Sequence, residues 1–251
     1  MTIAIMSAMA EENASLLSHM TNVSTQQVGR RVYHTGELWG QPVVSVFSHW
    51  GKVAAASTAT YLIAGLGVKE IIFTGVAGGM HHDLNIGDIV IADQLYQHDM
   101  DASPIIPRHE IPLLGRAAID SDHQRRASLQ AAAEAFVTEQ LNTVLSDKTR
   151  DEFSLHQPKV VVADIASGDQ FISSDAEVLS LRERLPSVGC VEMEGAAIAQ
   201  VCQDFEVPFS VVRTISDSAD DEAHVDFPKF IEEVAQVYSL GILRSLFQSM
   251  D

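Results

Sequence analysis

The stretch EIIFTGVAGG, from Glu70 to Gly79, decides the expected fold. Its first half, 70–74, is a short apolar run of the kind that forms a buried strand. The glycines of the second half, 75–79, predict a turn whose backbone can approach a ligand closely, although a purely structural turn accounts for them equally well. No Lys-Ser/Thr follows and the G-x-G-x-x-G spacing is absent. The stretch is therefore neither a Walker loop nor a dinucleotide fingerprint.

Strand and helix patterns alternate on both sides of this stretch. Short apolar runs predict further buried strands, and residues with helical spacing predict the helices between them. The alternation predicts an α/β fold, a three-layer α/β/α sandwich around a central mixed or mostly parallel sheet. The expected strands are 2–6, 43–48, 86–93, 160–165 and 208–215, and the expected helices are 10–20, 52–66, one after Glu194, and 227–247.

The least regular region is 100–158, which holds four of the eight prolines. We expect a long loop there, followed by one exposed helix at about 125–145. Long loops in compact domains often serve as lids or interface elements. No linker-like stretch divides the chain, so we predict that residues 1–251 form a single domain.

Composition excludes several classes of partner. The formal net charge is −18, which repels nucleic-acid phosphates and anionic lipid heads, so we expect no nucleic-acid and no membrane partner. The longest apolar stretch, 53–68, contains three Ser and Thr residues and is too short to span a bilayer. The first residues lack the basic segment of a secretory signal. Together with two cysteines expected to be reduced, this predicts a cytoplasmic protein.

Two segments beside predicted strands carry candidate ligand-binding residues. Glu11 and Glu12 open the helix after the first strand, where acidic residues also simply favour the helix dipole. The stretch SGDQFI, 167–172, places a glycine turn beside Phe171, which suits a flat base stacked on the ring. A turn with Phe171 in the core is the alternative.

A third group combines carboxylates with one arginine. Glu192 and Glu194 lie in the apolar stretch VEMEGAA, and carboxylates in such a setting are rarely buried unless they are paired or functional. Arg213 is expected to end an apolar strand, with Asp217 just beyond it. A structural Arg–carboxylate ion pair is the alternative explanation.

Taken together, these motifs resemble those of the nucleoside phosphorylase/nucleosidase superfamily. Within it, the chain is similar to the 5′-methylthioadenosine/S-adenosylhomocysteine nucleosidases from residue 3 to the final helix. The combination is specific, although no single motif is. It consists of Met-x-x-Glu at 9–12, GxAGG at 75–79 followed by IGDIV at 86–90, SGDxFI at 167–172, VEMEGAA at 191–197 and RTISDxAD at 213–220.

The resemblance implies a nucleoside phosphorylase-like fold and a hydrolase of 5′-modified adenosines that uses no metal and no organic cofactor. Glu12 corresponds to the carboxylate that activates water, Asp217 to the general acid at the purine, and Arg213 to the arginine near the water and the carboxylates. Glu194 corresponds to the carboxylate that binds the ribose hydroxyls. The other implied substrate-binding residues are Met9, Trp50, Val76, Ala77, Gly78, Phe171, Ile172, Glu192, Met193, Ser216 and Phe227.

The chemistry agrees with these implied roles. Cleavage of an N-glycosidic bond builds positive charge on the ribosyl ring and negative charge on the leaving base. An acid is therefore needed at the base, and a second group must orient water on the opposite face of the sugar. Asp217 has to hold a proton at neutral pH, whereas Glu12 has to be ionised, which Arg213 would favour.

Phosphorolysis is the main alternative to hydrolysis. It would require a group of cationic residues that bind phosphate. The related phosphorylases carry an arginine before the glycine turn and a hydroxyl residue within it, where this chain has Phe73 and Val76. No Lys or Arg occurs before residue 29, so we expect hydrolysis. An aminodeoxyfutalosine nucleosidase and a nucleoside-binding protein without activity are further alternatives.

Three points concern the pocket and its surroundings. Trp50 and Val76 replace residues that are usually smaller or hydroxylated in the family, which leaves the preferred 5′ substituent open. Neither His81-His82 nor the stretch 98–101 has a complete set of metal ligands, so we expect no metal. The resemblance implies a homodimer in which the neighbour closes the 5′ pocket, with 100–158 as the expected contact.

Overall fold

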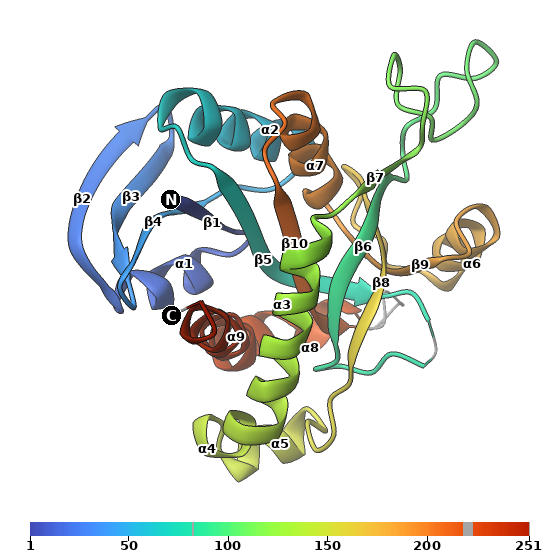
Figure 1. Ribbon diagram of the computed structural model, residues 1–251. Helices are drawn as coiled ribbons and strands as arrows, with labels where there is room; N and C mark the ends of the chain where they lie inside the picture. The colour runs from blue at the N-terminus through green and yellow to red at the C-terminus, as the bar shows by residue number, and fades with distance from the viewer. Residues whose placement is uncertain (82, 218–222, 251) are drawn as a thin grey trace.

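In the computed structural model, which describes residues 1–81, 83–217 and 223–250, the strands form one ten-stranded mixed sheet (Figure 1). The strands are β1 (Ile3–Ser7), β2 (Met20–Val28), β3 (Arg31–Leu38), β4 (Gln41–Phe47), β5 (Glu70–Gly79), β6 (Ile89–Gln97), β7 (Ala118–Asp120), β8 (Val160–Ser167), β9 (Val188–Glu192) and β10 (Phe209–Asp217).

Part of the sheet closes on itself. The strand order is β10-β6-β8-β9-β5-β1-β4-β3-β2, with β7 on β6, and β10 also pairs with β5. Strands β5, β9, β8, β6 and β10 therefore form a ring, from which β1, β4, β3 and β2 extend as an open wing. Strand β1 is parallel to β4 and β5, and β10 is parallel to β5, while β10–β6 and β5–β9 are antiparallel. The predicted mixed sheet is confirmed.

The helices are α1 (Ala10–Leu17), α2 (Lys52–Thr60), α3 (His123–Ala135), α4 (Leu141–Val144), α5 (Asp147–Glu152), α6 (Asp175–Arg184), α7 (Gly195–Asp204), α8 (Ala223–Phe230) and α9 (Gln236–Gln248). Single wide π-type turns follow α2 at Tyr61–Gly65, follow α3 at Phe136–Gln140, and join α8 to α9 at Ile231–Ala235. No helix of the described residues is long and apolar enough to cross a bilayer.

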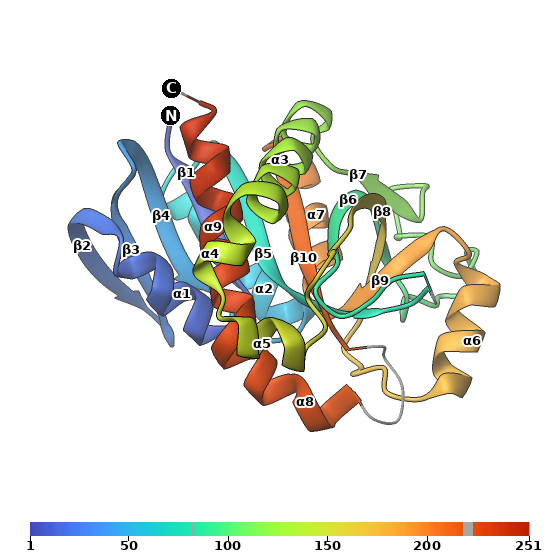
Figure 2. The same ribbon diagram turned by 90° about the horizontal axis from the view of Figure 1, so that it is seen from below.

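Two helix layers cover the two faces of the sheet. Because successive side chains of a strand point to opposite faces, Ile3 and Ile5 of β1 pack with α1, α3 and α9, while Ala4 and Met6 pack toward α2 and α7. Figure 2 shows α3 and α9 in front of the sheet and α2 and α7 behind it. The predicted three-layer α/β/α sandwich is confirmed, and α6 covers a smaller third cluster with β9.

The predicted glycine turn at 75–79 is wrong, because β5 continues to Gly79. Its second half pairs with two strands at once: Gly75 lies opposite Arg213 of β10, and Gly78 lies opposite Val191 of β9. Arg213 consequently lies within β10 instead of at its end. Glycine is needed at Gly75 because a Cβ there would overlap the guanidinium of Arg213.

The helix predicted at 125–145 is present as α3, a π-type turn and α4, but it is not exposed as expected. One face, with Leu129, Ala133 and Phe136, is buried because α9 packs against it. Sequence reasoning also missed the β2–β3 hairpin. Strand β2 has almost no buried side chains, so its polar sequence lacks the apolar alternation that indicates a strand.

The packing of α9 against α3 yields a prediction at Gly241. A Cβ at this position would overlap the ring of Phe136, which is fully buried and has no room to move aside. We expect Gly241→Ala to lower the free energy of unfolding by about 1–3 kcal/mol, since overpacking outweighs the gain in helix propensity of up to about 1 kcal/mol. Urea denaturation measures this change. Arg244→Ala, an exposed substitution on the same helix, should stay within about 0.5 kcal/mol of the unmodified chain. A stabilised Gly241→Ala variant would contradict the packing argument.

Candidate functional site

A cavity lies where the carboxyl ends of several strands meet, the usual place for a ligand in an α/β fold. It encloses about 760 Å³, part of it open to solvent. The walls come from the segments that follow β1, β4, β8 and β9 and from the ends of β5 and β10. The lining residues are Ala8, Met9, Trp50, Val76, Ala77, Gly78, Gln170, Phe171, Ile172, Val191, Glu192, Met193, Glu194, Ser216, Asp217 and Phe227.

The structure therefore brings together all twelve residues expected to bind substrate, and Asp217 with them. Glu12 and Arg213 are not among the lining residues. Both are buried beside the cavity wall, Glu12 on α1 one turn beyond Met9 and Arg213 on β10 before Ser216. Residues Ala8, Gln170 and Val191 line the cavity without having been expected there. Each is adjacent in sequence to an expected residue, which is the signal that locates them.

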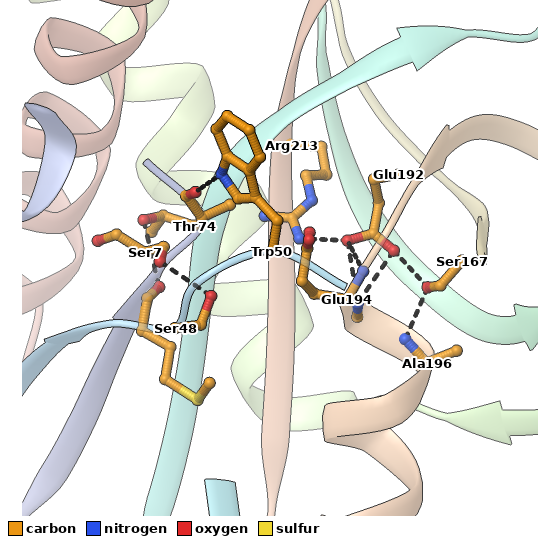
Figure 3. Close-up of polar contacts among 12 residues, drawn as sticks. Ser7, Ser48, Trp50, Thr74, Ser167, Glu192, Glu194, Ala196 and Arg213 are labelled. Atoms are coloured by element: carbon orange, nitrogen blue, oxygen red, sulfur yellow. Dashed lines mark hydrogen bonds and ion pairs between the residues drawn. The ribbon is translucent and has the colours of Figure 1, made fainter. Parts of the chain in front are cut away.

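Glu192 is the polar centre of the site (Figure 3). Its Oε2 accepts a hydrogen bond of 2.5 Å from Nη2 of Arg213, so the structural ion pair considered from the sequence is present. Its Oε1 accepts from the hydroxyl of Ser167, and the backbone N–H groups of Glu194 and Gly195 donate to the same carboxylate. Glu192 thereby satisfies the first N–H groups of α7 and fixes the β9–α7 junction.

Arg213 is fully buried and only partly satisfied. Its guanidinium carbon lies 3.9 Å from the ring centroid of Phe73, a cation–π contact. Among the described residues, Nε and Nη1 of Arg213 have no hydrogen-bond partner. Nη1 is directed toward Gly75 and the Ala8 side chain, which is the cavity side of β1 and β5. Buried donors without a partner are uncommon in folded proteins and are typical of sites that receive a ligand or water.

Glu194 lies at the start of α7 and faces the cavity. Its Oε1 accepts a 2.8 Å hydrogen bond from the backbone N–H of Gly51. Burial, followed by the nearby charge of Glu192, raises the pKa of Glu194, while Arg213 and the Gly51 N–H act in the opposite direction. The resulting pKa is about 7, so the charge of this carboxyl changes near neutral pH.

Glu12 is 1% exposed and receives a 2.5 Å hydrogen bond from the hydroxyl of Ser239. Its second oxygen, Oε2, has no partner among the described residues. Burial raises the pKa of Glu12 from 4.5 to about 7, against the lowering effects of Ser239 and Arg213. Sequence reasoning missed Ser239. The only signal for it is a lone serine on the buried face of the closing helix.

The cavity lining also includes one aspartate and several aromatic rings. Asp217, at the end of β10, is buried and accepts a 2.7 Å hydrogen bond from the hydroxyl of Ser216. Phe171 is half exposed, and its ring meets that of Phe227 edge-on at 6.4 Å between centroids. Phe171 is thus at the cavity and not in the core. Trp50 is 63% exposed, and its indole N–H donates to the carbonyl of Ala8 (Figure 3).

In the described part of the chain, no group of three His, Cys, Asp or Glu side chains is arranged to hold a metal ion. His82, one of the histidines considered from the sequence, lies outside the described residues.

The burial of Glu12 predicts how stability depends on pH. The folded-state pKa is raised, so its contribution to stability is fully present below pH 4.5 and is lost as the pH rises to about 7. The corresponding loss is about 3 kcal/mol at pH 8. Glu12→Gln keeps an acceptor for Ser239 and never ionises. We expect it to be more stable than the unmodified chain at pH 8 and equally stable near pH 4.5, by chemical denaturation at both values. A stability gain that is the same at both pH values would contradict this account.

Comparisons with known proteins agree with this site. Residues 2–248 match the phosphorylase superfamily. The 5′-methylthioadenosine/S-adenosylhomocysteine nucleosidase of Bacillus subtilis (strain 168) is 35% identical over 235 residues, 94% of each chain. The nucleosidase of the same name from Neisseria meningitidis, solved in complex with methylthio-immucillin-A, has a TM-score of 0.86 and 32% identity over 99% of each chain. The futalosine hydrolase of Helicobacter pylori strain 26695 has a TM-score of 0.81 and 34% identity, covering 99% of this chain and 97% of that one.

Proposed function

Because the chain belongs to the phosphorylase superfamily and, within it, to the 5′-methylthioadenosine/S-adenosylhomocysteine nucleosidases, we propose that it hydrolyses the N-glycosidic bond of 5′-modified adenosines. The substrates are 5′-methylthioadenosine and S-adenosylhomocysteine, with 5′-deoxyadenosine as a further candidate. The products are adenine and the 5′-modified ribose. The enzyme is thus an N-glycosyl hydrolase, and we propose that it needs neither a metal nor an organic cofactor.

One observation supports hydrolysis in particular: three carboxylates line the cavity, and no Lys or Arg does among the described residues. Arg213, the cation beside the cavity, is held by Glu192. A phosphate dianion placed here would face like charges and lack the cationic cradle that phosphorolysis requires. Water, which is neutral, meets no such penalty.

The proposed roles divide between the two sides of the sugar. Asp217 donates a proton to the purine as the bond between C1′ and the base nitrogen breaks, so that adenine leaves neutral. A water molecule, oriented by the ionised Glu12 with Arg213 nearby, bonds to C1′ from the opposite face, and its proton passes to Glu12. The proton gained by Glu12 and the one lost by Asp217 exchange with solvent, so the net reaction consumes one water molecule.

The remaining residues bind the substrate. Glu194 accepts hydrogen bonds from the ribose hydroxyls, with Met193 beneath the sugar. The adenine ring stacks on Phe171 beside Ile172, against Val76, Ala77, Gly78 and Ser216. Met9, Trp50 and Phe227 surround the 5′ substituent, and Glu192 lines the cavity and holds Arg213.

A second substrate class has a specific observation in its favour. The Helicobacter pylori relative is named a futalosine hydrolase and is 34% identical to this chain, against 32% for the Neisseria meningitidis nucleosidase, with TM-scores of 0.81 and 0.86. Trp50 adds a large, partly exposed aromatic surface at the cavity mouth, which suits a bulky 5′ group. A futalosine-type nucleoside, such as aminodeoxyfutalosine, is therefore the alternative substrate for the same chemistry.

We also propose that residues 1–251 form a single domain and that two copies of the chain form a homodimer. We propose that the protein is cytoplasmic and serves methionine salvage. The segment between β6 and β7, residues 98–117, projects from the body of the protein (Figure 1) and carries the exposed Ile105 and Leu113. Exposed apolar side chains on a projecting loop favour a contact with a second copy. Light scattering that gives a fully active monomer would exclude this arrangement.

Product analysis tests the reaction. The purified protein, incubated with 5′-methylthioadenosine, should release free adenine and free methylthioribose at a rate that phosphate does not change. Chromatography with mass spectrometry identifies both products. A sugar 1-phosphate that forms only when phosphate is present would replace hydrolysis by phosphorolysis. Turnover of aminodeoxyfutalosine alone would select the second substrate class.

The catalytic roles predict large losses of turnover and a defined pH profile. Asp217→Asn and Glu12→Gln should each lower kcat at least about 100-fold, the usual contribution of a general acid or base. Because the pKa values of Glu12 and Glu194 are both about 7, kcat/KM of the unmodified enzyme should fall below pH 7 by about tenfold or more for each pH unit. Steady-state rates from pH 5 to 9 measure both effects. Near-normal turnover in either variant refutes the role of that residue.

A further inference from the structure

A closed cycle of hydrogen bonds lies outside the cavity and joins two of its walls. The side chain of Lys52 donates to Oδ1 of Asp99 at 2.6 Å. The other oxygen of Asp99, Oδ2, accepts from the backbone N–H of Asp169 at 2.9 Å. The carboxylate of Asp169 in turn accepts from the backbone N–H of Lys52 at 2.7 Å, which closes the cycle. None of these three residues lines the cavity.

The two segments joined by this cycle carry residues that face the cavity. Trp50 directly precedes Gly51 and Lys52, and Gln170, Phe171 and Ile172 directly follow Asp169. The cycle therefore determines how far the turn after β4 lies from the loop after β8. Asp99 forms one of two links between them, through its two oxygens, and the other is the direct hydrogen bond from the Lys52 N–H to Asp169.

The turn is held in a conformation that depends on its neighbours. Gly51 has a φ of +88°, and a Cβ there would lie 2.9 Å from the Asp169 carboxylate. In this conformation the Gly51 N–H donates to Oε1 of Glu194 at 2.8 Å. On the other side of Gly51, the turn is held by the indole N–H of Trp50, which donates to the carbonyl of Ala8 at 2.9 Å. The direction of the hydrogen bond to Glu194 thus depends on the cycle on the Lys52 side and on the Trp50 contact on the other.

Asp99 is well suited to hold this arrangement. Burial alone would raise its pKa, but the hydrogen bonds from Lys52 and from the Asp169 backbone lower the pKa of Asp99 below its ordinary value. The carboxylate stays ionised over the neutral range and can accept from both partners. A second support comes from Gln97, whose side-chain oxygen also accepts from Lys52 at 3.1 Å.

We propose that Asp99 is a positioning residue: it ties the Trp50–Lys52 turn to the loop 167–172 and so sets the hydrogen bond by which Gly51 orients Glu194 toward the ribose hydroxyls. The inference rests on the proposed function, in which Glu194 binds those hydroxyls. It adds a requirement that lies outside the cavity: ribose recognition depends on a carboxylate that never touches the nucleoside.

Asp99→Asn is a sensitive substitution. An amide has one oxygen that accepts and one NH₂ nitrogen that only donates, so it would present N–H₂ either to the ammonium of Lys52 or to the N–H of Asp169. One of the two links must then break. Asp101→Asn is the matched control, because Asp101 lies on the same segment but bonds to Ser103 and Arg108 at the surface.

The test measures binding by calorimetry in the Asp217→Asn background, with 5′-methylthioadenosine and its 2′-deoxy analogue as ligands. We expect Asp99→Asn to weaken binding of the ribonucleoside about tenfold, the effect of one misdirected charge-assisted hydrogen bond, and to change binding of the deoxy analogue less than about threefold. The control Asp101→Asn should change neither affinity. In a Glu194→Gln background, Asp99→Asn should cause little further loss.

A second pair of variants covers the case in which Asp99→Asn fails to fold. Asp169→Asn keeps an oxygen that can accept from the Lys52 N–H, whereas Asp169→Ala does not. We expect the alanine variant to lose ribonucleoside affinity selectively and the asparagine variant to recover it. Equal weakening of both ligands, or no weakening, overturns the positioning role of Asp99.

The outcome also separates this inference from the proposed function. If the unmodified chain binds both nucleosides but releases no adenine, the proposed hydrolase function is refuted. A selective loss of ribonucleoside binding in Asp99→Asn would still support the positioning role in that case. A chain that binds neither nucleoside overturns both.

Discussion

The buried ion pair between Arg213 and Glu192 is the interaction on which the site depends. It joins β10 to the β9–α7 junction, where the side chains of Arg213 and Glu192 are 0% and 3% exposed. Removing two charges from water is costly and is offset only when their remaining hydrogen bonds are satisfied. Glu192 is satisfied by Ser167 and by the first N–H groups of α7. Arg213 is not, because its Nε and Nη1 have no hydrogen-bond partner among the described residues, and Nη1 lies beside Gly75. The pair therefore fixes the geometry of the site and leaves two donor nitrogens of Arg213 without a partner in the described part of the chain.

Electrostatics link the acidic residues around this pair. Arg213 lowers the pKa of both Glu12 and Glu194, while burial raises both values to about 7. The effect of burial is the larger of the two, and each carboxyl can therefore change its protonation state close to neutral pH. A more exposed site would leave both groups permanently ionised, and a drier one without the arginine would leave them permanently neutral. The depth of the site and the buried charge of Arg213 are thus parts of one arrangement.

The sequence predicted the candidate site better than the details of the fold, for a physical reason. The expected residues lie at or just beyond strand ends, and parallel strands bring their carboxyl ends together, so local motifs were enough to place Asp217, Glu194 and Phe171 at one cavity. Glu12 and Arg213 were predicted to act there but lie behind the wall, since burial depth is not visible in local sequence. Gly75 was misassigned to a turn because its pairing with β10 joins segments more than 130 residues apart. The β2–β3 hairpin was missed because an exposed strand needs no apolar alternation.

Closure of five strands into a ring has a consequence for aggregation. A strand at the edge of a sheet presents unpaired N–H and C=O groups that can pair with another molecule. The ring leaves the sheet path of the described residues with two such edges, β2 at the end of the wing and β7 beside β6. Strand β7 has only three residues. Strand β2 is longer, but its pairing with β3 shifts register between Thr21 and Ser24, where Asn22 has a φ of +54°. A short edge and a bulged edge are both poor templates for a foreign strand, so the topology that assembles the cavity also protects the sheet from fibril-like association.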